Sequence, residues 1–162
     1  MNTLLLRLAK VGMLLGILTI LCGTVLAHDP GLSAVEVRIL ENRIVAEVSF
    51  SPLDLDKIQP VDANLLTVED DQGKLELRSF SRNSPDQNSV HFQLEFSSSK
   101  AAKLRISAPV LANLPRGHKQ FCSVYDRQNS VLAERMLSAE SKEFTIDVQA
   151  SPANNRSFGR FL

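Results

Sequence analysis

The stretch "VHFQLEF" (residues 90–96) decides the fold of this chain. Four apolar residues alternate in it with three polar ones. A period of two is typical of a β-strand that buries one face and exposes the other to water. The same alternation recurs in "VEVRI" (35–39) and in "FTIDV" (144–148). The sequence therefore predicts a protein built from half-buried strands.

Turn residues separate these runs and set the number of strands. "EDDQGKL" (69–75) offers Gly73 for the positive φ that hairpin loops need. In "SPLDLDKI" (51–58), Ser51 can cap one helical turn that begins at Pro52. The pattern predicts an all-β, two-sheet antiparallel sandwich of the immunoglobulin-like type with about 7–9 strands. The strands are expected near 34–40, 43–50, 65–70, 74–80, 89–97, 102–107, 118–126, 130–137 and 143–149.

The first 27 residues have the layout of a secretory signal peptide. Arg7 and Lys10 supply a positive start, an apolar run covers 11–26, and Ala27 is a small residue at the expected cleavage point. The apolar run has about 16 residues, fewer than the roughly 20 of a membrane-spanning helix, so an uncleaved anchor is the alternative. We expect a signal-peptide helix over 1–27 and a chain exported to the periplasm or the outer side of the cytoplasmic membrane.

The mature chain divides into a β-sandwich domain at 28–149 and a linker or tail at 150–162. The full chain has 18 basic and 18 acidic residues, and the signal removes two basic ones, so the mature net charge is −2. This balance gives no basic field for nucleic acid. Cys122 is the single cysteine after residue 27, so the domain is expected to rely on its apolar core rather than on a disulfide.

Three segments resemble a known family. They are "AHDPGLSAVEVRI" (27–39), "APVLANLPRGHKQFCSVYDRQNSVLAERML" (108–137) and "SFGRFL" (157–162). Together they resemble the exported N-terminal domain of HupE/UreJ-type membrane proteins, which are hydrogenase or urease accessory proteins. The resemblance implies that 150–162 would lead to a transmembrane domain, and that some relatives are nickel or cobalt permeases. This sequence ends before such helices, so we expect a truncated or split member whose partner is a transmembrane HupE/UreJ-type domain or protein.

His28 is the first candidate ligand for a metal ion. Cleavage after residue 27 would give it a free α-amine, which deprotonates near neutral pH. An amine and an imidazole together chelate Cu²⁺ or Ni²⁺. Pro30 has no N–H, so further ligands must come from elsewhere. Asp29 could add an oxygen, and the remaining imidazoles belong to His118 and His91.

Each of these residues also has a purely structural interpretation. His28 could simply follow a permissive cleavage site, and His91 lies on the polar face of its strand. His118 follows a Pro-Arg-Gly turn that its ring could hydrogen-bond. Four acids are expected to be solvated turn residues, because their spacing matches no Ca²⁺ loop: Asp54, Asp56, Asp70 and Asp71.

Two functions follow from these residues. The first is a non-catalytic exported domain that binds or presents a nickel, cobalt or copper ion to a membrane permease. The alternative is a metal-free interaction or structural ectodomain that docks on a membrane partner. Catalysis is not expected, because the serines form no nucleophile elbow and the chain has no glycine-rich phosphate loop. The two functions differ in one spatial requirement, since metal binding needs His28 within reach of another ligand.

Overall fold

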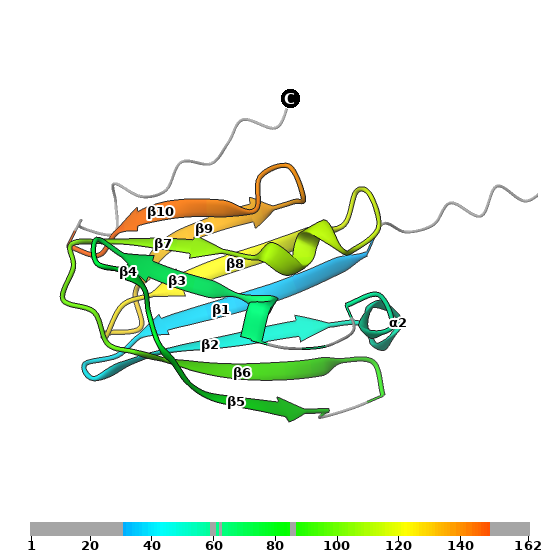
Figure 1. Ribbon diagram of the computed structural model, residues 1–162, viewed down its shortest axis with the longest axis horizontal. Helices are drawn as coiled ribbons and strands as arrows, with labels where there is room; N and C mark the ends of the chain where they lie inside the picture. Colours follow the sequence, from blue (N-terminus) through cyan, green and yellow to red (C-terminus); the bar gives the residue numbers. More distant parts are fainter. Residues whose placement is uncertain (1–30, 59–60, 62, 85–86, 150–162) are drawn as a thin grey trace, which may run out of the picture.

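Two β-sheets pack face to face in this protein (Figure 1). The computed structural model describes residues 31–149 except 59–60, 62 and 85–86. The larger sheet has the strand order β5-β6-β2-β1-β8-β9, and the smaller sheet has the order β10-β7-β3-β4. The strands are β1 (Leu32–Ile39), β2 (Arg43–Phe50), β3 (Thr67–Asp70), β4 (Gly73–Lys74), β5 (Leu77–Asn83), β6 (Val90–Ser97), β7 (Lys103–Ser107), β8 (Lys119–Tyr125), β9 (Val131–Leu137) and β10 (Glu143–Asp147).

The expected all-β class and two-sheet sandwich are confirmed. The strands alternate between buried and exposed residues as their sequences do, and β6 is the clearest case. The signal-peptide helix expected over 1–27 and the tail expected over 150–162 lie outside the described residues. Among the residues that the structure describes, no helix is long and apolar enough to cross a membrane.

Two features of the topology differ from the expectation. The run at 74–80 is not one strand, because β4 pairs with β3 in the smaller sheet while β5 pairs with β6 in the larger one. The chain crosses between the sheets near Leu75 and Leu77, which pack partly buried against the core. In addition, β1 pairs with β8 in parallel, although the other strand pairs are antiparallel. Alternation records which face of a strand is buried, but not which strand lies beside it.

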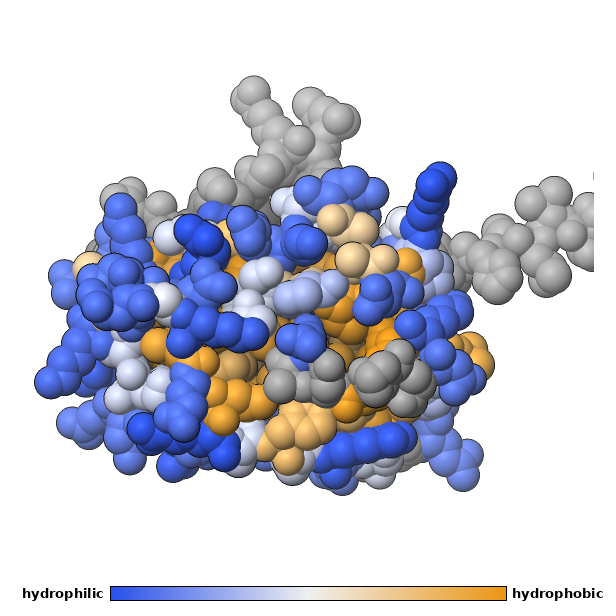
Figure 2. All heavy atoms as spheres, viewed as in Figure 1, coloured by the Kyte–Doolittle hydropathy of each residue, from blue (hydrophilic) through white to orange (hydrophobic). Residues whose placement is uncertain are grey.

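The middle of the sandwich is filled by apolar side chains. Phe92, Val48, Val35 and Cys122 lie side by side across four strands of the larger sheet, and each is buried. Burial raises the pKa of the Cys122 thiol to about 12. The thiol therefore stays protonated and unreactive, as expected for a buried cysteine in apolar surroundings. Figure 2 shows one broad face of the sandwich, with hydrophilic side chains around the rim and apolar ones between them.

Within the described ranges, three short helical turns connect strands of the sandwich. Helix α2 (Pro52–Leu55) begins as expected, because the Oγ of Ser51 accepts a hydrogen bond of 3.3 Å from the backbone N–H of Leu53. The 3₁₀ turns η1 (Ala63–Leu65) and η2 (Pro109–Ala112) contact each other. Helix α2 follows β2 directly, so it lies at the end of the larger sheet where β1 begins (Figure 1).

Candidate functional site

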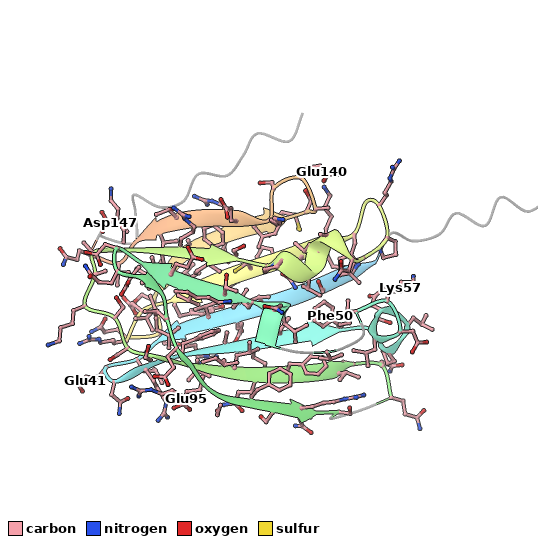
Figure 3. All side chains as sticks on the ribbon, viewed as in Figure 1. Glu41, Phe50, Lys57, Glu95, Glu140 and Asp147 are labelled. Atoms are coloured by element: carbon pink, nitrogen blue, oxygen red, sulfur yellow. The ribbon has the colours of Figure 1, made fainter. Side chains whose placement is uncertain are left out.

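Several buried polar side chains lie at the end of the sandwich at which β1 begins. We call this the amino-terminal end, and we call Ser33, Asp54, His118 and Gln120 the polar cluster. Figure 3 labels Phe50 and Lys57 near this end and Glu41 and Asp147 at the opposite end. His28 and Asp29, the first two candidate ligands, lie outside the described residues.

His91 is not part of the polar cluster. It lies on the outer face of β6, where its side chain is 29% exposed and its Nδ1 is 2.5 Å from the Oε1 of Glu47. Its Nε2 is 3.2 Å from the Oγ of Ser89. His118 is buried on the inner side of the same sheet. The structure therefore does not bring these two candidate ligands together.

His118 is held inside the sandwich by a tight turn. Gly117 adopts a positive φ of 89°, and the backbone N–H of His118 donates to the carbonyl of Pro115 at 3.0 Å. This turn directs the ring inward, where it is only 2% exposed. Its Nε2 lies 2.9 Å from the Oγ of Ser33 on β1. The turn geometry agrees with the structural interpretation of His118, but the buried ring also has a second polar neighbour.

That neighbour is Asp54, which corrects one expectation from the sequence. Asp54 was expected to be a solvated turn acid, yet it is only 6% exposed, whereas Asp56, two residues later at the end of α2, is exposed. The reason is that α2 folds back over the end of the core, so that Asp54 and Leu55 are both turned inward. The Oδ2 of Asp54 lies 3.9 Å from the Nδ1 of His118. This distance suits an ion pair but exceeds a hydrogen bond.

Gly31 brings the incoming chain directly against this pair. Its φ is +84°, and the backbone N–H of Lys119 donates to its carbonyl at 3.2 Å. A Cβ at residue 31 would lie 2.6 Å from the Nδ1 of His118 and 3.5 Å from the Oδ2 of Asp54. A side chain would therefore collide with the imidazole. Only glycine combines this backbone conformation with so close an approach.

Gln120 completes the polar cluster. It lies next to Ser33 in the parallel pairing of β1 with β8, two residues after His118. Its side chain is 0% exposed, and neither its amide nitrogen nor its amide oxygen has a hydrogen-bond partner among the residues that the structure describes. Burying an amide without a hydrogen bond is costly, so this residue calls for a polar partner.

The polar cluster holds a nitrogen and a carboxylate oxygen that could bind a cation, but not a complete metal site. Within the described residues, no group of three or more His, Cys, Asp or Glu side chains is arranged to hold a metal ion. Asp54 and His118 supply two of the usual ligand types. Further protein ligands would have to come from outside the residues that the structure describes.

In space, His118 lies between Ser33 and Asp54, as the histidine does in a hydrolytic triad. The detailed geometry, however, does not match that of a triad. The Oγ of Ser33 belongs to a buried side chain on the inner side of the sheet, where a substrate carbonyl has no access. In a triad the carboxylate orients the imidazole through a hydrogen bond, and 3.9 Å is too long for one. These three side chains therefore do not have the geometry of a hydrolytic triad.

Sequence reasoning missed Ser33, Asp54 and Gln120, although two of them carried a signal. Ser33 is in phase with the buried residues of β1, and Gln120 is in phase with those of β8. A polar residue in the buried phase of a strand marks a polar spot in the core. Asp54 had no such signal, because a helix of one turn has no period that distinguishes its inner side from its outer side.

Comparisons with protein-family models and with curated proteins identified no relative of this chain, since no family model and no curated protein matches it.

Proposed function

We propose that this chain is a non-catalytic exported domain that binds a transition-metal ion at its amino-terminal end. In line with the resemblance to HupE/UreJ-type proteins, it would present the ion to a transmembrane permease partner. One observation carries the proposal: Gly31, three residues after His28, packs directly on the buried pair of His118 and Asp54.

The length of the chain supports this role for His28. Three residues span at most roughly 10 Å when extended, so the chain length allows His28 to reach the polar cluster. Its amine and imidazole would bring two nitrogen ligands to a place where an imidazole nitrogen and a carboxylate oxygen are already 3.9 Å apart. Nitrogen and oxygen ligands of this kind suit copper, nickel or cobalt.

A calorimetric titration tests the proposal. The chain 28–162 contains every described strand, and it would be made once with a true His28 amine and once with one alanine before His28. Cu²⁺, Ni²⁺ and Co²⁺ would be titrated into each form. We expect one tight site in the first form and its loss in the extended form, because the extension moves the amine away from the imidazole. Equal weak binding by both forms would contradict the proposal.

His91→Ala is the matched control for this titration. It removes an imidazole from the outer face of the sheet and leaves the polar cluster intact. The variant should bind metal as the unaltered chain does. Loss of the tight site in His91→Ala would move the metal site to the outer face of β6.

A specific observation also favours the alternative, a metal-free interaction domain. Leu32, Phe121 and Met136 are exposed on the outer face of the larger sheet, and Leu32 is 65% exposed. With Ala34 they line a groove of about 460 Å³ at the amino-terminal end. Exposed apolar patches of this kind mark interaction surfaces.

Binding to isolated cytoplasmic membranes separates the two functions. Under the interaction proposal, the mature chain binds membranes that contain its partner, and Phe121→Glu abolishes this binding. A chelator would have no effect, because no metal takes part. Binding that the chelator removes would favour the metal-presenting function, and binding that survives Phe121→Glu would exclude this groove as the contact.

A further inference from the structure

We propose that the free edge of β5 is a docking site for an extended acidic peptide segment, which pairs with it as a further strand. Sheet edges bind partners in this way, because the main chain supplies hydrogen bonds while alternate side chains supply specificity. The site uses none of the residues of the polar cluster. It therefore goes beyond the proposed function and does not depend on metal binding.

The backbone of β5 is open along one side. This strand is the first of the larger sheet and pairs only with β6 (Figure 1). Six of its seven residues are exposed. No loop or turn of the described ranges hydrogen-bonds to the backbone of residues 78–83. The outward-facing N–H and C=O groups of β5 are therefore available to another strand.

The other sheet edges of the described chain are closed or short. The edge strands β9 and β10 contact each other, and β4 has only two residues. Native sheets protect a long open edge with charges and with irregular pairing. Both devices are present in β5, whose register shifts between Leu77 and Ser79 and which carries Arg78 and Arg82. These devices decide which partner the edge accepts.

The charge of β5 is entirely positive. Its sequence, LRSFSRN, holds two arginines and no acidic residue. Neither Arg78 nor Arg82 forms an ion pair with another described residue, whereas three other arginines each have a glutamate partner (Arg38, Arg43 and Arg105). Two uncompensated guanidinium groups on one open strand attract carboxylates, which arginine binds through two parallel hydrogen bonds.

Phe80 lies between the two arginines and adds an apolar contact. It pairs with the buried Leu94, and its ring stacks on that of Phe92 with 5.8 Å between the centroids. Its side chain therefore lies on the inner face of the sheet, yet Phe80 is 39% exposed. Figure 1 shows β5 at the border of the larger sheet, beyond the strands of the smaller one. An apolar residue of an incoming strand can pack against this exposed part of the ring.

The order of residues in β5 disfavours a second copy of this chain as the partner. The stretch RSFSR (78–82) reads the same in both directions. Two such strands paired antiparallel about Phe80 would place Arg78 of each copy opposite Arg82 of the other. Parallel strands in register would oppose each arginine with itself. Like charges directly opposite each other are destabilising, so both arrangements are unfavourable.

An acidic strand avoids this conflict when its residues have a particular spacing. One carboxylate two residues before an apolar residue and another two residues after it would face Arg78 and Arg82. The apolar residue between them would then lie beside Phe80. Opposite charges across a strand pair stabilise it, as do paired apolar residues. The partner is therefore a segment of the form acidic-x-apolar-x-acidic.

A peptide titration of the chain 28–162 tests the proposal. The probe is a fluorescently labelled peptide, Thr-Glu-Val-Phe-Val-Glu-Thr with blocked ends, and its matched control has lysine in place of both glutamates. Fluorescence anisotropy should show that the acidic peptide binds about tenfold or more tightly, because two favourable charge pairs become two repulsive ones in the control. Equal binding of the two peptides, or binding of neither, would overturn the proposal.

Hydrogen exchange of the unaltered chain locates the bound peptide. The acidic peptide should slow amide exchange in residues 79–83, because it hydrogen-bonds to their outward-facing groups. Exchange in β9 should stay as it is in the free chain. Slowed exchange centred on the groove of Leu32 and Phe121 would place the peptide elsewhere and contradict the site.

Exchanging the charges of the edge should exchange its preference. The double variant Arg78→Glu/Arg82→Glu should lose the acidic peptide and bind the lysine peptide instead. Lys57→Glu is the matched control, because it reverses an exposed positive charge outside β5. That variant should keep the preference of the unaltered chain. A double variant that still prefers the acidic peptide would contradict recognition by Arg78 and Arg82.

Arg78→Glu alone provides a test without a peptide. It makes the edge complementary to itself, because the new carboxylate of each copy would face Arg82 of the other. In sedimentation, Arg78→Glu should self-associate about tenfold or more tightly than both the unaltered chain and the double variant, in which like charges oppose each other. Equal self-association of all three would contradict an open edge. Both altered positions are exposed, and circular dichroism checks that the variants fold.

Discussion

The middle of this sandwich buries apolar side chains, whereas its amino-terminal end buries polar ones. In the middle, Phe92 and Val48 lie in a row of buried apolar side chains that crosses four strands. At the amino-terminal end, the same inner face buries the polar cluster of Ser33, Asp54, His118 and Gln120. Both regions are buried, and β1 and β8 contribute side chains to each of them, so the difference lies mainly in the chemistry of the side chains.

This difference shows where the stability of the domain comes from. Buried apolar area is the main driving force for folding, and the middle provides it. Each buried polar group without a good partner costs about 1–3 kcal/mol. The buried amide of Gln120, which has no hydrogen-bond partner among the described residues, therefore opposes folding, whereas the apolar middle favours it.

The largest effect is expected in the middle. Phe92→Ala should lower the free energy of unfolding by about 3–5 kcal/mol, because it removes a large buried ring and leaves a cavity. Urea unfolding measures this loss, and copper affinity in the folded variant should stay unchanged. A loss below about 1 kcal/mol would contradict the assignment of stability to the middle.

Gly31→Ala should have a somewhat smaller effect on stability and a specific effect on binding. A left-handed alanine costs about 1–2 kcal/mol, and its Cβ would also meet the Nδ1 of His118 at 2.6 Å. Gly73→Ala is the matched control, because Gly73 also has a positive φ but nothing within 4 Å of the added Cβ. Both variants should unfold at lower urea, yet only Gly31→Ala should weaken copper binding. Equal copper affinity in the two variants would separate Gly31 from the site.

Gln120→Leu should have the smallest effect and the opposite sign. Replacing the buried amide with a similar apolar side chain should stabilise the metal-free chain by about 1 kcal/mol. Gln93→Leu, on the exposed face of β6, is the control and should give no such gain. Destabilisation by Gln120→Leu in the metal-free chain would mean that this amide already has a partner, and the contrast between the two regions would weaken.

The strands in the middle of the sandwich could be predicted from the sequence, but the polar cluster at the amino-terminal end could not. Alternation predicted the strands, because burial on one face leaves a period of two. It could not predict the parallel pairing of β1 with β8, which is what brings Ser33 beside Gln120. Nor could it predict that α2 turns Asp54 inward onto His118. The polar cluster joins residues from three distant segments, and only the folded chain brings them together.

Paramagnetic broadening by Cu²⁺ tests the central claim most directly. Substoichiometric Cu²⁺ would be added to the ¹⁵N-labelled chain 28–162, and its amide signals would be followed by nuclear magnetic resonance. The account predicts that signals of Gly31, Leu55 and Lys119 broaden first, while those of Asn129 and Gln149 at the opposite end stay sharp. Broadening centred on His91, or equal broadening at both ends, would contradict a metal site at the amino-terminal end.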